Sequence, residues 1–99
     1  MFVKYYAPWC GHCKALEPTW DELAISVKNV DDLIIAKFDA DANKISGLQI
    51  SGYPTIKFYP KENKNGIDYN GGRHLNDFEQ WLGENSSAYG KFMTGQTKN

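Results

Sequence analysis

The sequence predicts an α/β fold in which a small mixed sheet is flanked by helices. Runs of β-branched and aromatic residues at 1–7 and 32–40 indicate strands, and the stretch between them carries an apolar helical face. Two more strand signals, at 54–60 and 67–71, are joined through an Asn-Gly turn. A strand–helix–strand start predicts a right-handed parallel crossover, and the later hairpin adds antiparallel strands. We therefore expect one domain with the element order β-α-β-α-β-β-α.

The spacing of apolar residues defines the helices. The first helix should span about 10–27 and the last should begin near residue 74, with Gly83 as a candidate stop. Polar residues with scattered apolar positions at 41–50 indicate a short helix between them. The near-continuous apolar run at 32–40 predicts a strand that is buried on both faces. The two long helical faces consist of Leu16, Trp20, Leu23 and Val27, and of Leu75, Phe78, Trp81 and Leu82.

Length, charge and hydropathy set further expectations. We expect the folded domain to occupy residues 1–84 and the polar residues 85–99 to form a fraying tail. Eleven basic and twelve acidic residues leave a net charge of −1, so bulk charge predicts neither a nucleic-acid partner nor a membrane surface. The apolar stretches are too short to span a bilayer. The chain starts as a strand already in progress, so we expect a piece of a longer protein with other domains. We also expect this piece to be a monomer.

Both cysteines lie in the stretch APWCGHCKALEP, residues 7–18. Residues three apart at the start of a helix lie on the same side of its first turn, so the sulfurs of Cys10 and Cys13 can approach bonding distance with little backbone change. The first turn carries a partial positive charge that stabilises a thiolate, and a protonated His12 would add to it. We therefore expect a redox pair, with Cys10 as the nucleophile and the more buried Cys13 as the resolving thiol.

Three other interpretations of the cysteine pair stay open. A zinc site needs four ligands, and besides the two sulfurs only His12 and His74 offer ring nitrogens. Covalent haem attachment needs a histidine directly after the second cysteine, where this chain has Lys14. The cysteines could also be an inert buried pair. We favour the redox interpretation, which needs no metal and no cofactor, because a C-x-x-C motif beside a β-α-β pattern is typical of it.

The segments YYAPWCGHCKALEP and GYPTIKFYP resemble the catalytic domains of the protein disulfide isomerase family, within the thioredoxin family. The resemblance covers residues 2–82. It implies a thioredoxin fold, thiol–disulfide exchange on substrate proteins, and residence in the endoplasmic reticulum lumen. It also implies that Gly11 and His12 belong to the redox centre together with the cysteines. Complete thioredoxin domains carry a further strand and helix before this point, which we expect this chain to lack.

The resemblance assigns roles to residues outside that motif. Trp9, Tyr53 and Pro54 should contact substrate, and the Tyr53–Pro54 peptide bond should be cis, so that the backbone of Tyr53 can pair with an extended substrate segment. Arg73 lies where the family has an arginine that is proposed to swing toward the resolving cysteine. There its charge would lower the pKa of Cys13.

Lys4 departs from the family pattern. It lies six residues before Cys10, where many members of the family have a buried glutamate that relays a proton. A neutral buried amine could accept a proton, and a charged one near the sulfurs would favour thiolates. We expect instead that Lys4 reaches solvent. Lys37, aligned with a lysine that partners the family glutamate, could then pair with Asp39 on the same strand and face.

Two functions from different classes are consistent with these residues. The first is a thiol–disulfide oxidoreductase and isomerase that forms, reduces and rearranges disulfides in unfolded or disulfide-containing proteins. The second is a peptide-binding chaperone module, in which the surface around Trp9, Tyr53 and Pro54 holds unfolded chains and the thiols are secondary. We favour the first.

Overall fold

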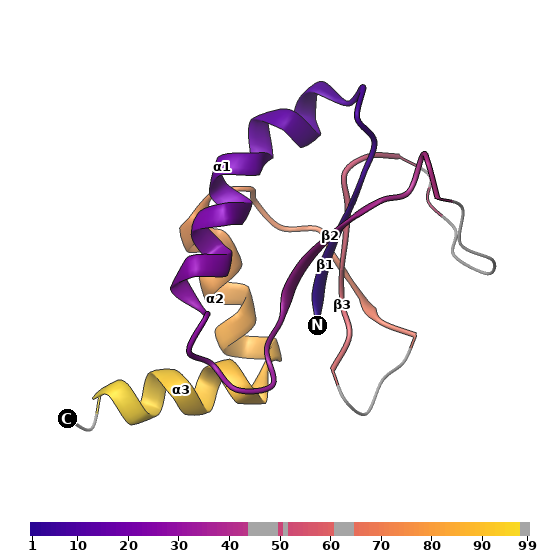
Figure 1. Cartoon of the computed structure of the whole chain (residues 1–99). Helices are drawn as coiled ribbons and strands as arrows, with labels where there is room; N and C mark the ends of the chain where they lie inside the picture. Colours follow the sequence, from indigo (N-terminus) through magenta and orange to yellow (C-terminus); the bar gives the residue numbers. More distant parts are fainter. Residues whose placement is uncertain (44–49, 51, 61–64, 98–99) are drawn as a thin grey trace.

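The computed structural model describes residues 1–43, 50, 52–60 and 65–97, which form a four-stranded sheet and three helices. The first two helices lie on one side of the sheet, and the third lies below them and extends away from the sheet (Figure 1). In chain order the elements are β1 (Phe2–Tyr6), α1 (Gly11–Ser26), β2 (Ile35–Asp39), β3 (Thr55–Phe58), β4 (Ile67–Tyr69), α2 (Leu75–Asn85) and α3 (Ser87–Thr97).

The sheet is mixed, with the strand order β2-β1-β3-β4. β1 pairs with β2 in parallel, as the crossover predicted, and β3 pairs antiparallel with both β1 and β4. Gly66 precedes β4 with a φ of 83°, a left-handed conformation that suits the predicted Asn-Gly turn. The expected short helix at 41–50 falls largely on residues 44–49, which lie outside the described residues. The expected helical cover of the second sheet face is therefore not tested.

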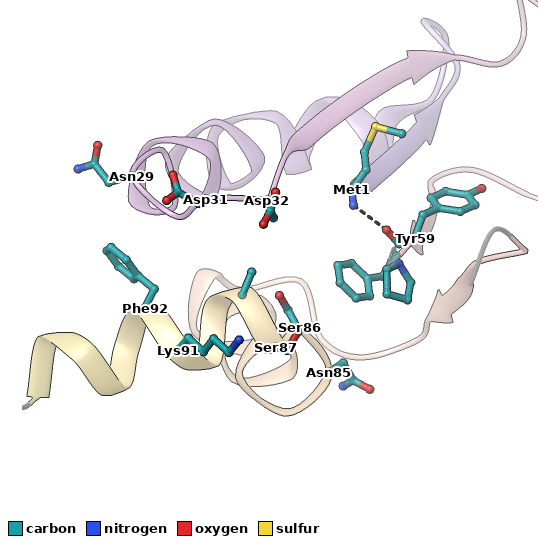
Figure 2. A pocket seen from close by; sticks show the side chains of 13 residues that line it. Met1, Asn29, Asp31, Asp32, Tyr59, Asn85, Ser86, Ser87, Lys91 and Phe92 are labelled. Carbon is teal, nitrogen blue, oxygen red and sulfur yellow. Dashed lines mark hydrogen bonds between the residues drawn. The ribbon is translucent and has the colours of Figure 1, made fainter. Parts of the chain in front are cut away.

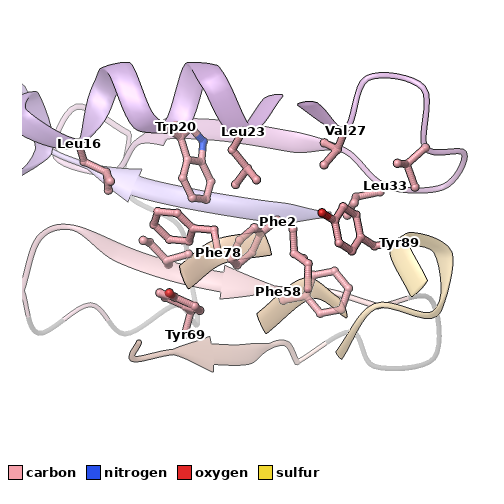
Figure 3. Close-up of a cluster of buried hydrophobic side chains, with 13 residues drawn as sticks. Phe2, Leu16, Trp20, Leu23, Val27, Leu33, Phe58, Tyr69, Phe78 and Tyr89 are labelled. Atoms are coloured by element: carbon pink, nitrogen blue, oxygen red, sulfur yellow. The ribbon is translucent and has the colours of Figure 1, made fainter. Parts of the chain in front are cut away.

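The main core lies between the sheet and the helices α1 and α2. Successive side chains of a strand point to opposite faces, so Phe2, Lys4 and Tyr6 of β1 share the face that α1 covers. Phe2 is fully buried and lies at the centre of an aromatic cluster (Figure 3). Its ring centroid is 5.1–6.1 Å from those of five other rings, which belong to Trp20, Phe58, Tyr69, Phe78 and Trp81.

The prediction that the strand at 32–40 is buried on both faces is wrong. β2 lies at one edge of the four described strands, its side chains are only partly buried, and Lys37 is exposed. β1 is the strand with the buried run, from Phe2 to Tyr5. An apolar run identifies a strand, but its place in the sheet depends on which strands pair with it.

The C-terminal part also differs from the expected fraying tail. α2 continues through Gly83 to Asn85, and α3 follows after one residue. The Ser86 side chain accepts a hydrogen bond from the backbone N–H of Tyr89 at 3.1 Å, which caps the start of α3. Tyr89 is buried in the main core, and Phe92 packs against it. The sequence signal for α3 was a capping serine followed by apolar residues at helical spacing. The polar composition of the segment concealed this signal.

None of the helices in the described part of the chain is long and apolar enough to cross a membrane.

The aromatic cluster predicts a large effect of truncating its central ring. Phe2→Ala should lower the free energy of unfolding by about 3–5 kcal/mol, because it leaves a cavity against five aromatic rings. Denaturant unfolding followed by circular dichroism measures this loss. Ile25→Ala, on the exposed side of α1, serves as the control and should change the free energy by about 0.5 kcal/mol or less. A loss below 1 kcal/mol for Phe2→Ala would contradict the central role of this ring.

Candidate active site

A tight turn places the first cysteine at the N-terminus of α1. The backbone N–H of Cys10 donates to the carbonyl oxygen of Ala7 at 3.1 Å, which folds the chain back directly after β1. Cys10 is the N-cap residue of α1, with an extended backbone, and no acidic residue lies in the first turn. Its sulfur therefore faces the unpaired N–H groups and the partial positive charge of the helix end.

The two cysteines are free thiols in contact with each other. The Cys10 sulfur accepts a hydrogen bond from the backbone N–H of Cys13 at 3.1 Å. Both residues are buried, with exposed fractions of 6% for Cys10 and 2% for Cys13, so Cys13 is the more buried of the two, as predicted. Together with Ala7 they form a small apolar cluster against which Tyr6 and Tyr53 pack.

The environment lowers the pKa of Cys10. Burial alone would raise the pKa of this thiol. Hydrogen bonds from the Cys13 thiol and from the backbone N–H groups of Cys13 and His12, with a smaller contribution from the charge of Arg73, outweigh that effect. Cys10 is thus the group that ionises more readily, which suits a nucleophile.

The pKa of Cys13 moves in the opposite direction. Burial raises the pKa of its thiol, and so do the hydrogen bond to the Cys10 sulfur and the charge that develops there. A backbone hydrogen bond at Ala7 and the positive charge of Lys4 lower the pKa in part. Because a thiolate on one sulfur opposes ionisation of its neighbour, the pair is arranged to ionise one sulfur at a time.

Of the two residues between the cysteines, only His12 is seen to contact a sulfur, and it does so through its backbone. Both residues are exposed in the first turn of α1. The contact of His12 with the Cys10 sulfur is made by its backbone N–H, so the imidazole is not needed for that interaction. A Cβ atom at Gly11 would meet nothing within 4 Å, so steric crowding does not explain glycine at this position.

The predicted substrate-contacting residues gather beside the cysteines. Trp9 is 67% exposed, and its ring packs edge-to-face on that of Tyr53, with 5.6 Å between centroids. The Tyr53–Pro54 peptide bond is cis, as the resemblance implied. A cavity of about 350 Å³ continues from Tyr53 and Pro54 along β3 toward Asn70. Tyr53 therefore links the exposed Trp9 ring, the redox pair and this cavity.

The loop between β4 and α2 holds Arg73. The Tyr69 hydroxyl donates to the carbonyl oxygen of Gly72, and the carboxylate of Asp77 accepts from the backbone N–H of His74 at 3.1 Å. A Cβ atom at Gly72 would clash with that carboxylate, so glycine permits this close packing. Arg73 itself is exposed, and its charge acts on Cys10. The predicted approach of Arg73 to Cys13 stays a prediction.

Lys4 does not reach solvent, contrary to expectation. It is 1% exposed and lies on the face of β1 that α1 covers. The suggested pairing of Lys37 with Asp39 is also absent: the carboxylate of Asp39 accepts hydrogen bonds from the backbone N–H groups of Asp41 and Ala42. A charged residue inside an otherwise apolar strand was the sequence signal for burial, because alternation puts Lys4 on the same face as Phe2.

A separate cavity lies away from the redox pair. It has a volume of about 570 Å³ and opens between the end of β3, the loop after α1 and the junction of α2 and α3 (Figure 2). The amino group of Met1 donates a hydrogen bond to the carbonyl oxygen of Tyr59 at 2.8 Å, and both residues line the cavity. None of the predicted site residues lines this cavity.

In the described ranges, no three His, Cys, Asp or Glu side chains come together as a metal ion would need. Cys10 and Cys13 therefore have no further ligand beside them in this part of the chain.

Comparison with known proteins agrees with this geometry. The family model described as thioredoxin matches residues 1–84. The chain belongs to the thioredoxin family. A probable protein disulfide-isomerase A6 of Medicago sativa is 48% identical over 90 residues, which cover 89% of this chain and 25% of that protein. A protein disulfide-isomerase of Drosophila melanogaster is 47% identical over 88 residues, which cover 89% of this chain and 18% of that protein. The chain thus spans a quarter or less of these curated relatives.

Solved structures show the same fold. The first thioredoxin domain of mouse protein disulfide-isomerase A4 superposes with a TM-score of 0.67 and 36% identity, over 84% of this chain and 58% of that one. The J-Trx1 fragment of ERdj5 gives a TM-score of 0.71 with 26% identity, over 85% of this chain and 40% of that one. The thioredoxin fold implied by the sequence motifs is confirmed.

The opposite pKa shifts predict an order of reactivity for the two thiols. A lowered pKa leaves more thiolate at a given pH, so Cys10 in the Cys13→Ser variant should react with iodoacetamide at lower pH than Cys13 in the Cys10→Ser variant. Alkylation rates measured from pH 4 to about 10 give both midpoints. Equal midpoints, or the reverse order, would contradict the electrostatic account of the site.

Removal of the Arg73 charge should have a smaller effect, on the pKa of the Cys10 thiol. Arg73→Met removes a positive charge that favours the Cys10 thiolate, so the midpoint of Cys10 alkylation should move to higher pH. Because Arg73 is exposed, the difference from the wild type should shrink in high salt. Lys28→Met, beyond the far end of α1, is the matched control and should leave the midpoint in place. No movement with Arg73→Met would remove this residue from the site.

Proposed function

We propose that this domain is a thiol–disulfide oxidoreductase and isomerase acting on proteins, with Cys10 as nucleophile and Cys13 as resolving thiol. The observation that carries the proposal is the Cys10 sulfur at the N-cap of α1, hydrogen-bonded to the N–H of Cys13. That arrangement stabilises one thiolate and keeps a second sulfur in contact with it. Relatives named protein disulfide-isomerase support the same activity.

Reduction of a substrate proceeds in two exchanges. The Cys10 thiolate attacks one sulfur of the substrate disulfide, forms a mixed disulfide and releases the other sulfur as a thiolate. The Cys13 thiolate then attacks the Cys10 sulfur, releases the second substrate thiolate and leaves a Cys10–Cys13 disulfide. Two electrons pass from the domain to the substrate, and the reverse sequence oxidises a substrate dithiol. When a substrate thiol resolves the mixed disulfide instead, the domain is regenerated and the substrate disulfide has moved.

The neighbouring surface supports an extended polypeptide as substrate. Trp9 offers an exposed ring, and the backbone at Tyr53 and Pro54 lies between this ring and the hollow along β3. A strand-like segment placed there could pair with the backbone and bring its own sulfur to Cys10. We assign Trp9, Tyr53 and Pro54 to substrate binding on this basis. Gly11 and His12 form the link between the two cysteines, and Arg73 favours the Cys10 thiolate.

The family suggests the wider setting. We propose that residues 1–84 form the catalytic unit, that it functions in the endoplasmic reticulum lumen, and that it works beside other domains of a longer chain. The match of residues 1–84 to the family model and the small share of each relative that the chain covers support this arrangement. Substrates are unfolded or disulfide-containing proteins.

Removal of both thiols separates catalysis from peptide binding. The Cys10→Ser, Cys13→Ser double variant should bring the refolding of a protein with scrambled disulfides down to the uncatalysed rate, because no exchange can begin. Recovery of the refolding protein's own activity measures that rate. If the double variant promotes refolding at the full rate, the domain is instead the peptide-binding chaperone module.

The single variants test the two roles. Cys13→Ser should accumulate mixed disulfides with substrate, because the nucleophile remains and the resolving thiol is missing. Cys10→Ser should accumulate none, as seen by non-reducing electrophoresis after acid quenching. Trapping by Cys10→Ser alone would reverse the assignment of the two cysteines.

A further inference from the structure

Lys4 is the one buried charged side chain among the residues that the structure describes. It lies in the middle of β1, an inner strand, between Lys37 of β2 and Ile56 of β3 in the sheet register. Burial of an ammonium group without a carboxylate partner is costly, so such a residue calls for a physical reason.

The amino group of Lys4 lies beneath the first half of α1. Its nitrogen is 5.7 Å from the centroid of the Tyr6 ring and 6.0 Å from that of Trp20. Tyr6 also packs against the cluster that contains both cysteines. Trp20 follows Cys13 by seven residues, two helical turns, so the two side chains share the buried face of α1. The ammonium group therefore lies between the redox pair and the main core, over two aromatic faces that favour a cation.

The other charges around Lys4 do not pair with it directly. Burial is the main cause that lowers the pKa of the Lys4 amine; Glu17 of α1 raises this pKa, Lys37 of β2 lowers it and Asp21 of α1 raises it. Both carboxylates are exposed, and the described part of the chain contains no ion pair that includes Lys4. Among the ionisable groups that affect the pKa of Lys4, Cys13 is the one that is also buried, on the face of α1 that packs toward Lys4.

We propose that Lys4 is a positioning residue of the redox pair: its buried ammonium group favours the thiolate form of Cys13 and so speeds the step in which Cys13 displaces the substrate from Cys10. This proposal rests on the function proposed above. It assigns the two cations of the site to different sulfurs, with Arg73 acting on Cys10 and Lys4 on Cys13.

The resolving step shows why this charge is useful. Burial and the neighbouring sulfur raise the pKa of Cys13, which disfavours the thiolate that must attack. Once Cys10 is in a mixed disulfide, its negative charge is gone, and the Lys4 ammonium then favours a developing Cys13 thiolate. When the Cys10–Cys13 disulfide is formed, Cys13 carries no negative charge that the Lys4 ammonium could stabilise. Lys4 therefore favours the reduced state and makes the disulfide a stronger oxidant.

The first test compares Lys4→Met with Lys37→Met, each in a Cys10→Ser background. Methionine keeps the unbranched shape and suits a buried site, so the substitution removes the charge and preserves packing. We expect Lys4→Met to move the midpoint of Cys13 alkylation to higher pH, whereas Lys37→Met, its exposed neighbour in the register, leaves it unchanged. Lys4→Arg should restore the midpoint toward that of Lys4. An unchanged midpoint in Lys4→Met, or an equal movement in both variants, would overturn the proposal.

Kinetics give a second readout with Cys10 present. Lys4→Met should slow the release of substrate from a preformed mixed disulfide about tenfold at neutral pH, while the formation of that mixed disulfide by Cys10 keeps its rate. Quenched-flow separation of the two steps measures this. Slowing of both steps by the same factor would indicate a structural defect and overturn the assignment to Cys13.

A third measurement leaves Lys4 in place, so it holds even if Lys4→Met does not fold. Linked groups act on each other equally, so the Lys4 amine should titrate at lower pH in Cys13→Ser than in the reduced wild-type chain. Carbon-13 NMR of labelled lysine follows that titration. Identical titrations would overturn the proposal. Because the alkylation and NMR readouts need no substrate, they fail or succeed independently of the proposed isomerase activity.

Discussion

The hydrogen bond from the Cys13 N–H to the Cys10 sulfur is the interaction on which the chemistry of this domain depends. It can form because Cys10 caps α1, so that a sulfur takes the place that a serine or aspartate oxygen usually has. The geometry that begins the helix therefore also stabilises a thiolate at Cys10 and brings Cys13 into contact with it. A redox pair built from a helix cap needs no metal and no bound group to ionise.

β1 connects this site to the stability of the fold. One face of the strand carries Phe2 in the aromatic core, Lys4 beneath α1 and Tyr6 beside the cysteines, at every second position. The turn after β1 then delivers Cys10 to the start of α1. The reactive sulfurs are thus held by the central strand, while the residues proposed to meet substrate lie on the loops around them, where adjustment costs less.

Several features followed directly from local patterns. The apolar spacing in α1 and α2, the parallel crossover and the placement of Cys10 at a helix start all depend on neighbouring residues, so the sequence predicted them correctly. The edge position of β2 and the burial of Lys4 were missed, because each depends on which distant segments pack against the strand. α3 was missed because its polar composition concealed Ser86 as a cap and Tyr89 as a core residue.

By itself, the sequence determined that two cysteines three residues apart lie at a helix start, an arrangement typical of a redox pair. The tertiary structure decided how the two sulfurs differ. The charge of Arg73 lowers the pKa of Cys10 and that of the buried Lys4 lowers the pKa of Cys13, although burial raises the pKa of Cys13 overall. The physical reason is that hydrogen bonding along a helix acts over a few residues of chain, whereas burial and charge act through space between segments that only folding brings together.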